Sequence, residues 1–220
     1  MRGRFITFEG GEGSGKSTHA RLLADHLAEL GIEVVRTREP GGSPGAEAIR
    51  HILLSGIAKP LGAEAEAMLF AAARDDHVRS VIHPSLESGK WVVCDRFIDS
   101  TRVYQGIVGQ VDGKLIRKLE RVTVGDTMPD LTFVLDVPAS VGLARAQQRR
   151  GGGSADRYES EQLEFHEQLR RAYRAIAAEE PRRIVIIDGR PPRAVVASRI
   201  WETVEERLLA RSRAVEGAAP

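Results

Sequence analysis

A glycine-rich run near the start of the chain combines the residue types that bind phosphate. Residues 10–17 read Gly-Gly-Glu-Gly-Ser-Gly-Lys-Ser and satisfy the spacing G-x-x-x-x-G-K-[S/T] in full. Glycines let the backbone curl so that several N–H groups face one phosphate, and the start of a helix adds its positive end. We therefore expect Lys16 to reach the β- and γ-phosphates of ATP and the Ser17 hydroxyl to bind Mg²⁺. The predicted nucleotide-binding residues are Gly10, Gly11, Glu12, Gly13, Ser14, Gly15, Lys16, Ser17 and Thr18.

The context of this run favours a phosphate loop over a chance glycine-rich turn. The strand-like residues 4–8 precede it, and a helical pattern follows it. Such a loop occurs in kinases, ATPases, GTPase switches and nucleotide sensors alike. The base-reading motifs N-K-x-D and T-K-x-D, which are typical of GTPases, do not occur in the sequence, and this counts against a GTPase.

A second pair of charged residues follows the apolar residues Trp91–Cys94. Asp95 stands where a Walker B-type aspartate would end a strand, so we expect it to contact the magnesium ion through water. A helix N-cap is the alternative role for Asp95, and the two roles are compatible. Arg96 comes next, at the carboxyl edge of the strand, where α/β proteins bind ligands. The alternative for Arg96 is a surface ion pair with Asp99 or another carboxylate.

These residues need a scaffold, and the pattern of the chain predicts a parallel sheet covered by helices. Short apolar segments alternate with longer segments of helical spacing. One predicted helix has the leucines of residues 22–30 on one face and ends at Gly31, and another spans the Ala-rich residues 63–81. The predicted strands are Arg4–Phe8, Glu33–Thr37, Trp91–Cys94, Leu131–Leu135 and Arg183–Ile187.

The length and composition are typical of one soluble globular domain. Of the 220 residues, 42% are hydrophobic and 29% are charged, which is enough apolar material for a core. The formal net charge of +1, from 32 basic and 31 acidic residues, argues against broad nucleic-acid binding. No repeat or long linker divides the chain. We therefore expect one domain over residues 1–215, with a mobile lid near 145–160, and a tail over 216–220.

The sequence also predicts a cytoplasmic protein without membrane contact. Cys94 is the single cysteine, so no intramolecular disulfide can form, and its apolar neighbours predict a small buried side chain. No apolar stretch approaches the roughly 20 residues that span a bilayer. Residues 1–4 lead directly into a predicted strand, without the apolar core of a signal peptide.

Four further segments resemble those of bacterial thymidylate kinase, in order and in spacing, along nearly the whole chain. They are Phe8-Glu9-Gly10, Thr37-Arg38-Glu39-Pro40-Gly41-Gly42, Asp95-Arg96-Phe97 with Ser100-Thr101 and Tyr104-Gln105-Gly106, and Asp156-Arg157-Tyr158-Glu159. The resemblance implies an α/β fold of the P-loop nucleoside monophosphate kinase type, with a five-stranded parallel sheet flanked by helices. It also implies phosphorylation of dTMP to dTDP for dTTP synthesis, with ATP as the phosphoryl donor and Mg²⁺.

Family members form homodimers through helices, so the resemblance implies a homodimer here. The Ala-rich residues 63–81 could supply the dimer face. Core packing explains their composition equally well.

The resemblance assigns an acceptor site as well. The arginine that matches Arg96 holds the 5′-phosphate of dTMP, a task suited to a bidentate guanidinium, and Arg50 is a second candidate for this phosphate. Phe70 and Arg74 share one helix face and would stack on the base and read its exocyclic oxygen, although the pattern alone would make Phe70 a core residue. Tyr104 would lie near the 2′ position and favour deoxyribose. The expected acceptor-site residues are Glu12, Glu39, Arg50, Phe70, Arg74, Arg96, Ser100, Thr101, Tyr104 and Gln105.

Glu12 is an unexpected charge inside the phosphate loop, because a carboxylate near a triphosphate is repelled. The matching family position holds an acidic residue near the 3′-hydroxyl and phosphate of the acceptor. We therefore expect Glu12 to belong to both binding sites.

Phosphoryl transfer needs positive charge against the transferring group, yet the phosphate loop contains no arginine. Thymidylate kinases without that arginine carry arginines in a lid instead. The glycine-rich residues 151–154 would let such a lid close and exclude water, whereas a solvated basic loop is the alternative. The expected catalytic residues are Lys16 and one of Arg149, Arg150 and Arg157.

Two other functions stay open at this point. Another nucleotide kinase of the same fold would carry different groups at Phe70, Arg74 and Ser100. A P-loop regulator that binds ATP without turnover needs only one nucleotide site, so a second pocket beside the phosphate loop would count against it.

Overall fold

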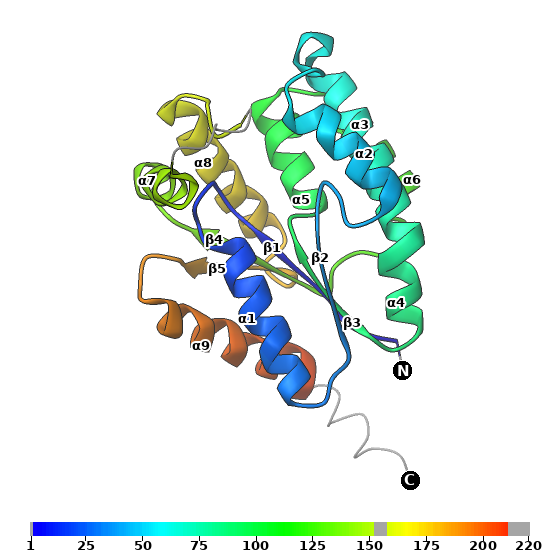
Figure 1. The fold of residues 1–220 in the computed structure, drawn as a ribbon, viewed down its shortest axis with the longest axis vertical. Helices are drawn as coiled ribbons and strands as arrows, with labels where there is room; N and C mark the ends of the chain where they lie inside the picture. The colour runs from blue at the N-terminus through cyan, green and yellow to red at the C-terminus, as the bar shows by residue number, and fades with distance from the viewer. Residues whose placement is uncertain (1, 152–157, 211–220) are drawn as a thin grey trace.

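A parallel sheet lies at the centre of the structure. A computed structural model describes residues 2–151 and 158–210. Within these ranges, five parallel strands pair in the order β2-β3-β1-β4-β5, and helices cover both faces of the sheet (Figure 1). The predicted α/β fold is therefore confirmed. The strands are β1 (Phe5–Glu9), β2 (Val34–Arg38), β3 (Trp91–Asp95), β4 (Leu131–Asp136) and β5 (Ile184–Asp188).

Every one of these strands ends one residue later than the sequence predicts, and the additional residue is charged. Apolar patterning stops at the last hydrophobic residue, whereas the backbone ladder continues, with Phe8 opposite Asp95 and Asp136 opposite Asp188. Because the strands are parallel, the charged side chains gather at the carboxyl edge of the sheet. They belong to Glu9, Arg38, Asp95, Asp136 and Asp188.

The helical segments largely follow the predicted pattern. The Ala-rich prediction is confirmed, because α3 and the wider turn η2 together span residues 62–82. Gly31 follows α1 with φ 78°, as expected for a glycine after a helix. The leucine face is only partly correct, since Leu23 and Leu27 are buried but Leu30 is 53% exposed. The helical segments are α1 (Lys16–Glu29), α2 (Pro44–Leu54), η1 (Lys59–Leu61), α3 (Gly62–His77), η2 (Val78–Ile82), α4 (His83–Glu87), α5 (Ile98–Thr101), η3 (Arg102–Val108), α6 (Gly113–Thr123), α7 (Ala139–Arg150), α8 (Leu163–Glu179), α9 (Arg193–Val204) and η4 (Glu205–Leu209).

Successive side chains of β1 point to opposite faces of the sheet and pack into two separate parts of the core. Ile6 and Phe8 pack with residues of α1 and α9 on one face. Phe5 packs on the opposite face, with residues of η2 and α4 and with Phe97. Since side chains alternate along a strand, Glu9 lies on the same face as Phe5, and its carboxylate accordingly meets the start of α5. The strand thus brings one buried acid to the helix that follows β3.

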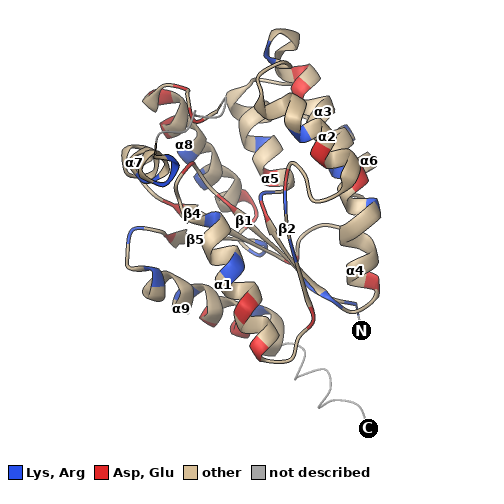
Figure 2. Ribbon diagram, in the orientation of Figure 1, with Lys and Arg blue, Asp and Glu red and all other residues tan. Residues whose placement is uncertain are grey.

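Basic and acidic residues are mixed over the helices, as Figure 2 shows. This mixing agrees with the formal net charge of +1. Cys94 is buried in β3, as predicted. In the part of the chain that the structure describes, no helix has both the length and the apolar character needed to cross a membrane. The predicted tail, 216–220, lies outside the described residues.

Candidate active site

The phosphate loop connects β1 to α1 and has the backbone that its glycines predict. Gly10, Gly13 and Gly15 have φ values of 129°, 63° and 101°, which side chains rarely tolerate. The Lys16 ammonium donates to the Gly11 carbonyl oxygen at 2.7 Å. Burial, followed by the charge of Arg96, lowers the pKa of Lys16 to about 8. Glu12 and Ser14 belong to the same loop, and Thr18 lies half-buried in the first turn of α1.

The Ser17 hydroxyl donates to the carboxylate of Asp95, which joins the two predicted magnesium residues. The N-cap alternative for Asp95 is wrong, because α5 begins at Ile98 and its N-cap is Phe97. A hydroxyl and a carboxylate are hard oxygen donors of the kind that Mg²⁺ prefers. The described residues contain no cluster of three or more metal-ligating acids, histidines or cysteines. The pair therefore fits an ion that keeps waters and nucleotide oxygens as its other ligands.

A cavity of about 200 Å³ opens beside the phosphate loop. Every residue that the sequence predicts for the acceptor site lines this cavity, together with Lys16, Ser17 and Asp95. Segments from α2, α3, β3 and η3 thus meet the phosphate loop at one place. The expected residues found there are Glu12, Glu39, Arg50, Phe70, Arg74, Arg96, Ser100, Thr101, Tyr104 and Gln105.

Arg96 lies at the boundary between the phosphate loop and this cavity. Its Nη2 donates to the Glu12 carboxylate, and its Nη1 lies 3.3 Å from the Gly10 carbonyl oxygen. Its backbone has φ 68°, a left-handed conformation that is uncommon for residues other than glycine. The alternative of an ion pair with Asp99 is wrong, because Asp99 is buried and pairs with Arg102 and Arg183 instead. Arg96 does pair with another carboxylate, that of Glu12, inside the site.

The half-buried Glu12 is ionised at neutral pH in this site. Burial alone would raise its pKa, but the charges of Arg96 and Lys16 outweigh burial and lower the pKa to about 2. The Tyr104 hydroxyl lies 3.4 Å from the same carboxylate. The Arg96 guanidinium also lies over the Tyr104 ring, 5.2 Å from its centre. The loop and the cavity therefore share one pair of opposite charges.

The far end of the cavity holds Arg74 in a fixed position. Its Nε donates to the Glu39 carboxylate at 2.8 Å, and its Nη2 donates to the Thr101 hydroxyl at 3.1 Å. His77 Nδ1 lies 3.1 Å from the other oxygen of Glu39. Phe70, four residues before Arg74 on α3, is half-buried and lines the cavity, so it is not the core residue that its pattern alone predicts.

The remaining acceptor-site residues lie on two sides of the cavity. The Arg50 guanidinium donates to the Pro40 carbonyl oxygen at 2.6 Å. Gln105 donates to the Tyr158 hydroxyl at 3.2 Å, and the Tyr158 ring packs edge-on against Tyr104. Tyr158, from the fourth segment of the family resemblance, therefore also belongs to this cavity.

Two of the candidate lid arginines, Arg149 and Arg150, lie at the end of α7, outside the acceptor cavity. Arg149 and Arg150 both donate to Glu159, at 3.3 and 2.5 Å, and Arg149 remains 65% exposed. Arg157 lies outside the described residues. The exposure of Arg149 agrees with the alternative of a solvated basic loop. Its charge nevertheless helps to lower the pKa of Glu12, so it acts on the phosphate loop.

Two glycines bring α7 close to the phosphate loop. A Cβ atom at Gly13 would overlap the Gly142 carbonyl oxygen, and a Cβ atom at Gly142 would overlap the Glu12 carbonyl oxygen. The backbone nitrogen of Ala146 lies 3.1 Å from the same position beside Gly13. Arg149 follows Ala146 by about one helical turn, so the end of α7 lies near the nucleotide-binding loop.

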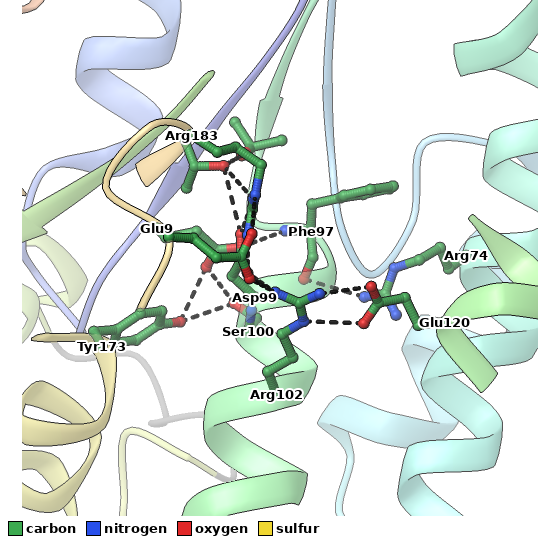
Figure 3. A network of polar contacts seen from close by, with 12 residues as sticks. Glu9, Arg74, Phe97, Asp99, Ser100, Arg102, Glu120, Tyr173 and Arg183 are labelled. Atoms are coloured by element: carbon green, nitrogen blue, oxygen red, sulfur yellow. Dashed lines mark hydrogen bonds and ion pairs between the residues drawn. The ribbon is translucent and has the colours of Figure 1, made fainter. Parts of the chain in front are cut away.

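Some residues that support the site are not among the predicted site residues. Glu9 is completely buried and does not line the cavity. Figure 3 shows its contacts with Ser100 and Tyr173. A charged residue directly after an apolar strand is a signal for Glu9, but it does not say which partners the carboxylate meets. Tyr173 and His77 lie within helical patterns and look like ordinary helix residues in the sequence.

The site pairs a Walker-type phosphate loop with an adjoining cavity on a parallel sheet of order β2-β3-β1-β4-β5. This combination defines the class of P-loop nucleoside monophosphate kinases. The family model described as thymidylate kinase matches residues 8–200. The chain therefore belongs to the thymidylate kinase family.

Individual relatives agree with this assignment. The thymidylate kinase of Afipia carboxidovorans is 61% identical over 207 residues, which cover 94% of this chain and 91% of the relative. That of Nitrobacter winogradskyi is 58% identical over 218 residues, covering 99% of this chain and 95% of the relative. The crystal structure of thymidylate kinase from Ehrlichia chaffeensis superimposes with a TM-score of 0.74 at 35% identity, over 93% of this chain and 99% of that one.

Proposed function

We propose that the two adjoining sites carry out the reaction of the family as follows. The protein phosphorylates dTMP to dTDP, with ATP as the phosphoryl donor. The observation that supports this proposal most directly is the Glu12–Arg96 pair, which joins the phosphate loop to the second cavity. A transfer between two nucleotides requires their phosphates to meet, and this pair lies where the two sites adjoin.

The donor side of the reaction uses the phosphate loop. Its backbone N–H groups and the start of α1 bind the phosphates of ATP, and Lys16 approaches the β- and γ-phosphates. The negative charge of the triphosphate opposes the effect of burial on Lys16 and keeps its ammonium protonated. Ser17 and Asp95 would hold Mg²⁺, which neutralises charge on the phosphate oxygens when it is bound.

The acceptor side uses the cavity. Arg96 exchanges part of its contact with Glu12 for the 5′-phosphate of dTMP, and Arg50 provides a second cation for this phosphate. Phe70 stacks on the thymine ring, and Arg74 donates to a base oxygen. A guanidinium has donors and no acceptor, so the fixed Arg74 favours a carbonyl oxygen over the amino group of cytosine.

The other polar side chains of the cavity line the deoxyribose and the base. Ser100, Thr101 and Gln105 satisfy polar edges within a largely apolar pocket. Tyr104 leaves no room for a 2′-hydroxyl, and Glu12 lies near the 3′-hydroxyl. Glu39 holds Arg74 in place, which its hydrogen bond supports.

The transferring phosphoryl group needs further positive charge, and we assign it to the lid arginines. The absence of arginine from the phosphate loop and the position of α7 beside that loop support this assignment. Arg149 and Arg150 are at the correct end of α7, and Arg157 is the third candidate.

We also propose that the protein is a cytoplasmic homodimer. Exposed apolar side chains on α3 and α6, Met68 and Val122, support a contact between two copies, since large apolar groups are otherwise mostly buried. The cytoplasmic assignment rests on the substrates, because ATP and nucleoside monophosphates are cytoplasmic metabolites.

A coupled ADP-release assay across dTMP, dUMP, dCMP, AMP and GMP tests the proposed reaction. We expect dTMP to be the preferred acceptor. The Lys16→Ala variant should lose at least about a hundredfold in turnover, because its charge faces the transferring group. Lys90→Ala is the matched control, since Lys90 pairs with Glu33 far from the loop and should leave turnover unchanged. The proposal would be refuted if none of the monophosphates caused ADP release, or if all of them caused equal release.

A further inference from the structure

We propose that Glu9 is a positioning residue for Arg96, acting through Ser100 and Tyr173, and that it thereby sets the affinity for the acceptor phosphate. The inference rests on the proposed role of Arg96 in binding that phosphate. Glu9 itself does not line the cavity. Its effect must therefore pass through the side chains between it and the guanidinium.

The Glu9 carboxylate is completely buried and accepts four hydrogen bonds. One oxygen accepts from the backbone N–H groups of Phe97 and Ser100, at 2.8 and 3.2 Å. The other accepts from the hydroxyls of Ser100 and Tyr173, at 2.6 and 3.0 Å. Figure 3 shows these groups converging on the acid from α5 and α8.

The two hydroxyls connect Glu9 to the guanidinium. Arg96 Nη1 donates to the Ser100 oxygen at 3.2 Å and to the Tyr173 oxygen at 3.4 Å. A hydroxyl has one hydrogen, so when it donates to the carboxylate its lone pairs are available to an N–H group on the other side. Glu9 therefore orients both hydroxyls as acceptors for Arg96. Without the carboxylate, either hydroxyl can rotate and present its hydrogen to the cation.

The backbone contacts of Glu9 act on Arg96 as well. Arg96 has the left-handed φ of 68°, and the next residue, Phe97, donates its N–H to Glu9. A residue other than glycine stays in this conformation only when its surroundings hold it there. The Glu9 carboxylate thus restrains the turn that directs the Arg96 side chain toward Glu12 and the cavity.

A second buried acid offers a comparison for a purely structural role. Asp99 is also completely buried and lies on the same short helix as Ser100. It pairs with Arg102 at 3.2 Å and with Arg183 at 2.6 Å, and within the described residues no hydrogen bond or ion pair joins it to Arg96. Loss of its charge should therefore affect stability without changing the binding of the acceptor.

The test measures the KM for dTMP, the KM for ATP, kcat and the Tm at pH 8 for three variants. Glu9→Gln keeps the shape but removes the charge, and should raise the KM for dTMP about tenfold with the KM for ATP unchanged. Tyr173→Phe removes one of the two hydroxyls and should raise the KM for dTMP by a smaller factor. Asp99→Asn should lower the Tm and leave both KM values unchanged.

A double-mutant cycle with Arg96→Ala separates positioning from general damage. If Glu9 acts through Arg96, then Glu9→Gln should add nothing to the KM for dTMP once Arg96 is replaced. Additive effects would overturn the inference, as would an unchanged KM for dTMP in both Glu9→Gln and Tyr173→Phe. If Glu9→Gln does not fold, Tyr173→Phe and its own cycle with Arg96→Ala decide. An unchanged KM for dTMP in Arg96→Ala would instead refute the proposed role of Arg96.

Discussion

Arg96 is bound by acceptors from three separate parts of the chain. Gly10 and Glu12 belong to the phosphate loop, Ser100 belongs to α5, and Tyr173 belongs to α8. Because a guanidinium has five donors in a fixed plane, it can keep several of these contacts while one side turns to a phosphate. At the residue scale, contacts from three segments therefore hold the Arg96 side chain in place.

The protonation of Glu9 gives a prediction for stability against pH. Burial, and then the charge of Asp99, raise the pKa of Glu9 from 4.5 to about 7, although Ser100, Arg96 and Phe97 oppose this rise. The folded state therefore binds this proton more tightly than the unfolded state does. The stabilisation that comes from protonated Glu9 is complete below about pH 4.5 and is lost as the pH rises through about 7. The other titratable groups that the Glu9 charge reaches are Lys16, Cys94, Tyr104 and Tyr173.

Urea unfolding of the wild type and Glu9→Gln between pH 5 and pH 8.5 measures this effect. The glutamine does not titrate, so the difference in the free energy of unfolding, wild type minus variant, should fall as the pH rises. A difference that stays constant or increases would contradict the prediction.

The sequence predicts the residues that form a motif better than the residues that support it. Lys16, Ser17, Asp95 and Arg96 follow from spacing and from their place after a strand, and the structure brings them together. Tyr173 could not be predicted in this way, because its partner Glu9 lies 164 positions away in the chain. A contact of that kind depends on how α8 packs on the sheet, which no local pattern records.

At the scale of elements, the predicted strands all stop one residue short, and in β1 and β3 that residue, Glu9 or Asp95, belongs to the site. Hydrophobic patterning identifies the buried part of a strand, so it excludes Glu9 and Asp95, although backbone pairing includes them. The order β2-β3-β1-β4-β5 also could not be derived from the pattern, because strand neighbours are set by contacts between distant segments. The type of each element was predictable, while its last residue and its neighbours were not.

The close approach of α7 to the phosphate loop gives a prediction for Gly142→Ala. Replacing a glycine inside a helix by alanine usually stabilises it by about 1 kcal/mol. Here the added Cβ would overlap the Glu12 carbonyl oxygen, so we expect a loss of about 1–3 kcal/mol instead. The displaced loop should also raise the KM for ATP. Val141→Ala, on the more exposed side of α7, is the control and should have little effect on either quantity. A more stable Gly142→Ala protein would show that α7 does not pack against the loop.

The lid arginines give the second prediction at this scale. We expect one of Arg149→Ala, Arg150→Ala and Arg157→Ala to lower kcat by about 10³-fold or more, with much smaller changes in either KM. Arg149 is our first choice, because it is the most exposed of the described pair and its charge reaches Glu12.

The matched control for these substitutions is Arg171→Ala, which removes an exposed arginine paired with Glu164 on α8. It should leave kcat unchanged. If the triple variant of Arg149, Arg150 and Arg157 turns over within a few-fold of the wild type, the lid hypothesis fails. The catalytic charge must then come from Lys16 and the metal ion alone, or from Arg145 or Arg38.

At the scale of the whole molecule, the proposed homodimer depends on the apolar surface of α3 and α6. Met68 is 51% exposed and Val122 is 76% exposed, although α3 also buries Ala67 and Ala71. The Ala-rich segment therefore packs inside at Ala67 and Ala71 and faces outward at Met68, and a dimer face there stays a proposal.

Sedimentation of the wild type should give twice the chain mass of 24.1 kDa. Met68→Asp and Val122→Asp should shift the protein toward a monomer, because an ionised carboxylate in an apolar interface is costly to desolvate. Val195→Asp, which replaces an exposed valine of α9, should remain a dimer. A wild-type monomer, or dimers in all variants, would contradict an interface on these helices.

The left-handed backbone of Arg96 has a consequence for how this protein balances folding against activity. Alanine normally stabilises a folded protein more than glycine does. At φ 68°, however, the Cβ atom of any other residue strains the backbone, and glycine removes this strain. Both Arg96→Gly and Arg96→Ala lose the guanidinium, so their comparison isolates the backbone. We expect the glycine variant to be more stable by about 1 kcal/mol in urea unfolding, and the reverse order would show that the turn is unstrained. Selection for tighter folding alone would favour glycine at position 96, whereas only selection for turnover keeps an arginine there.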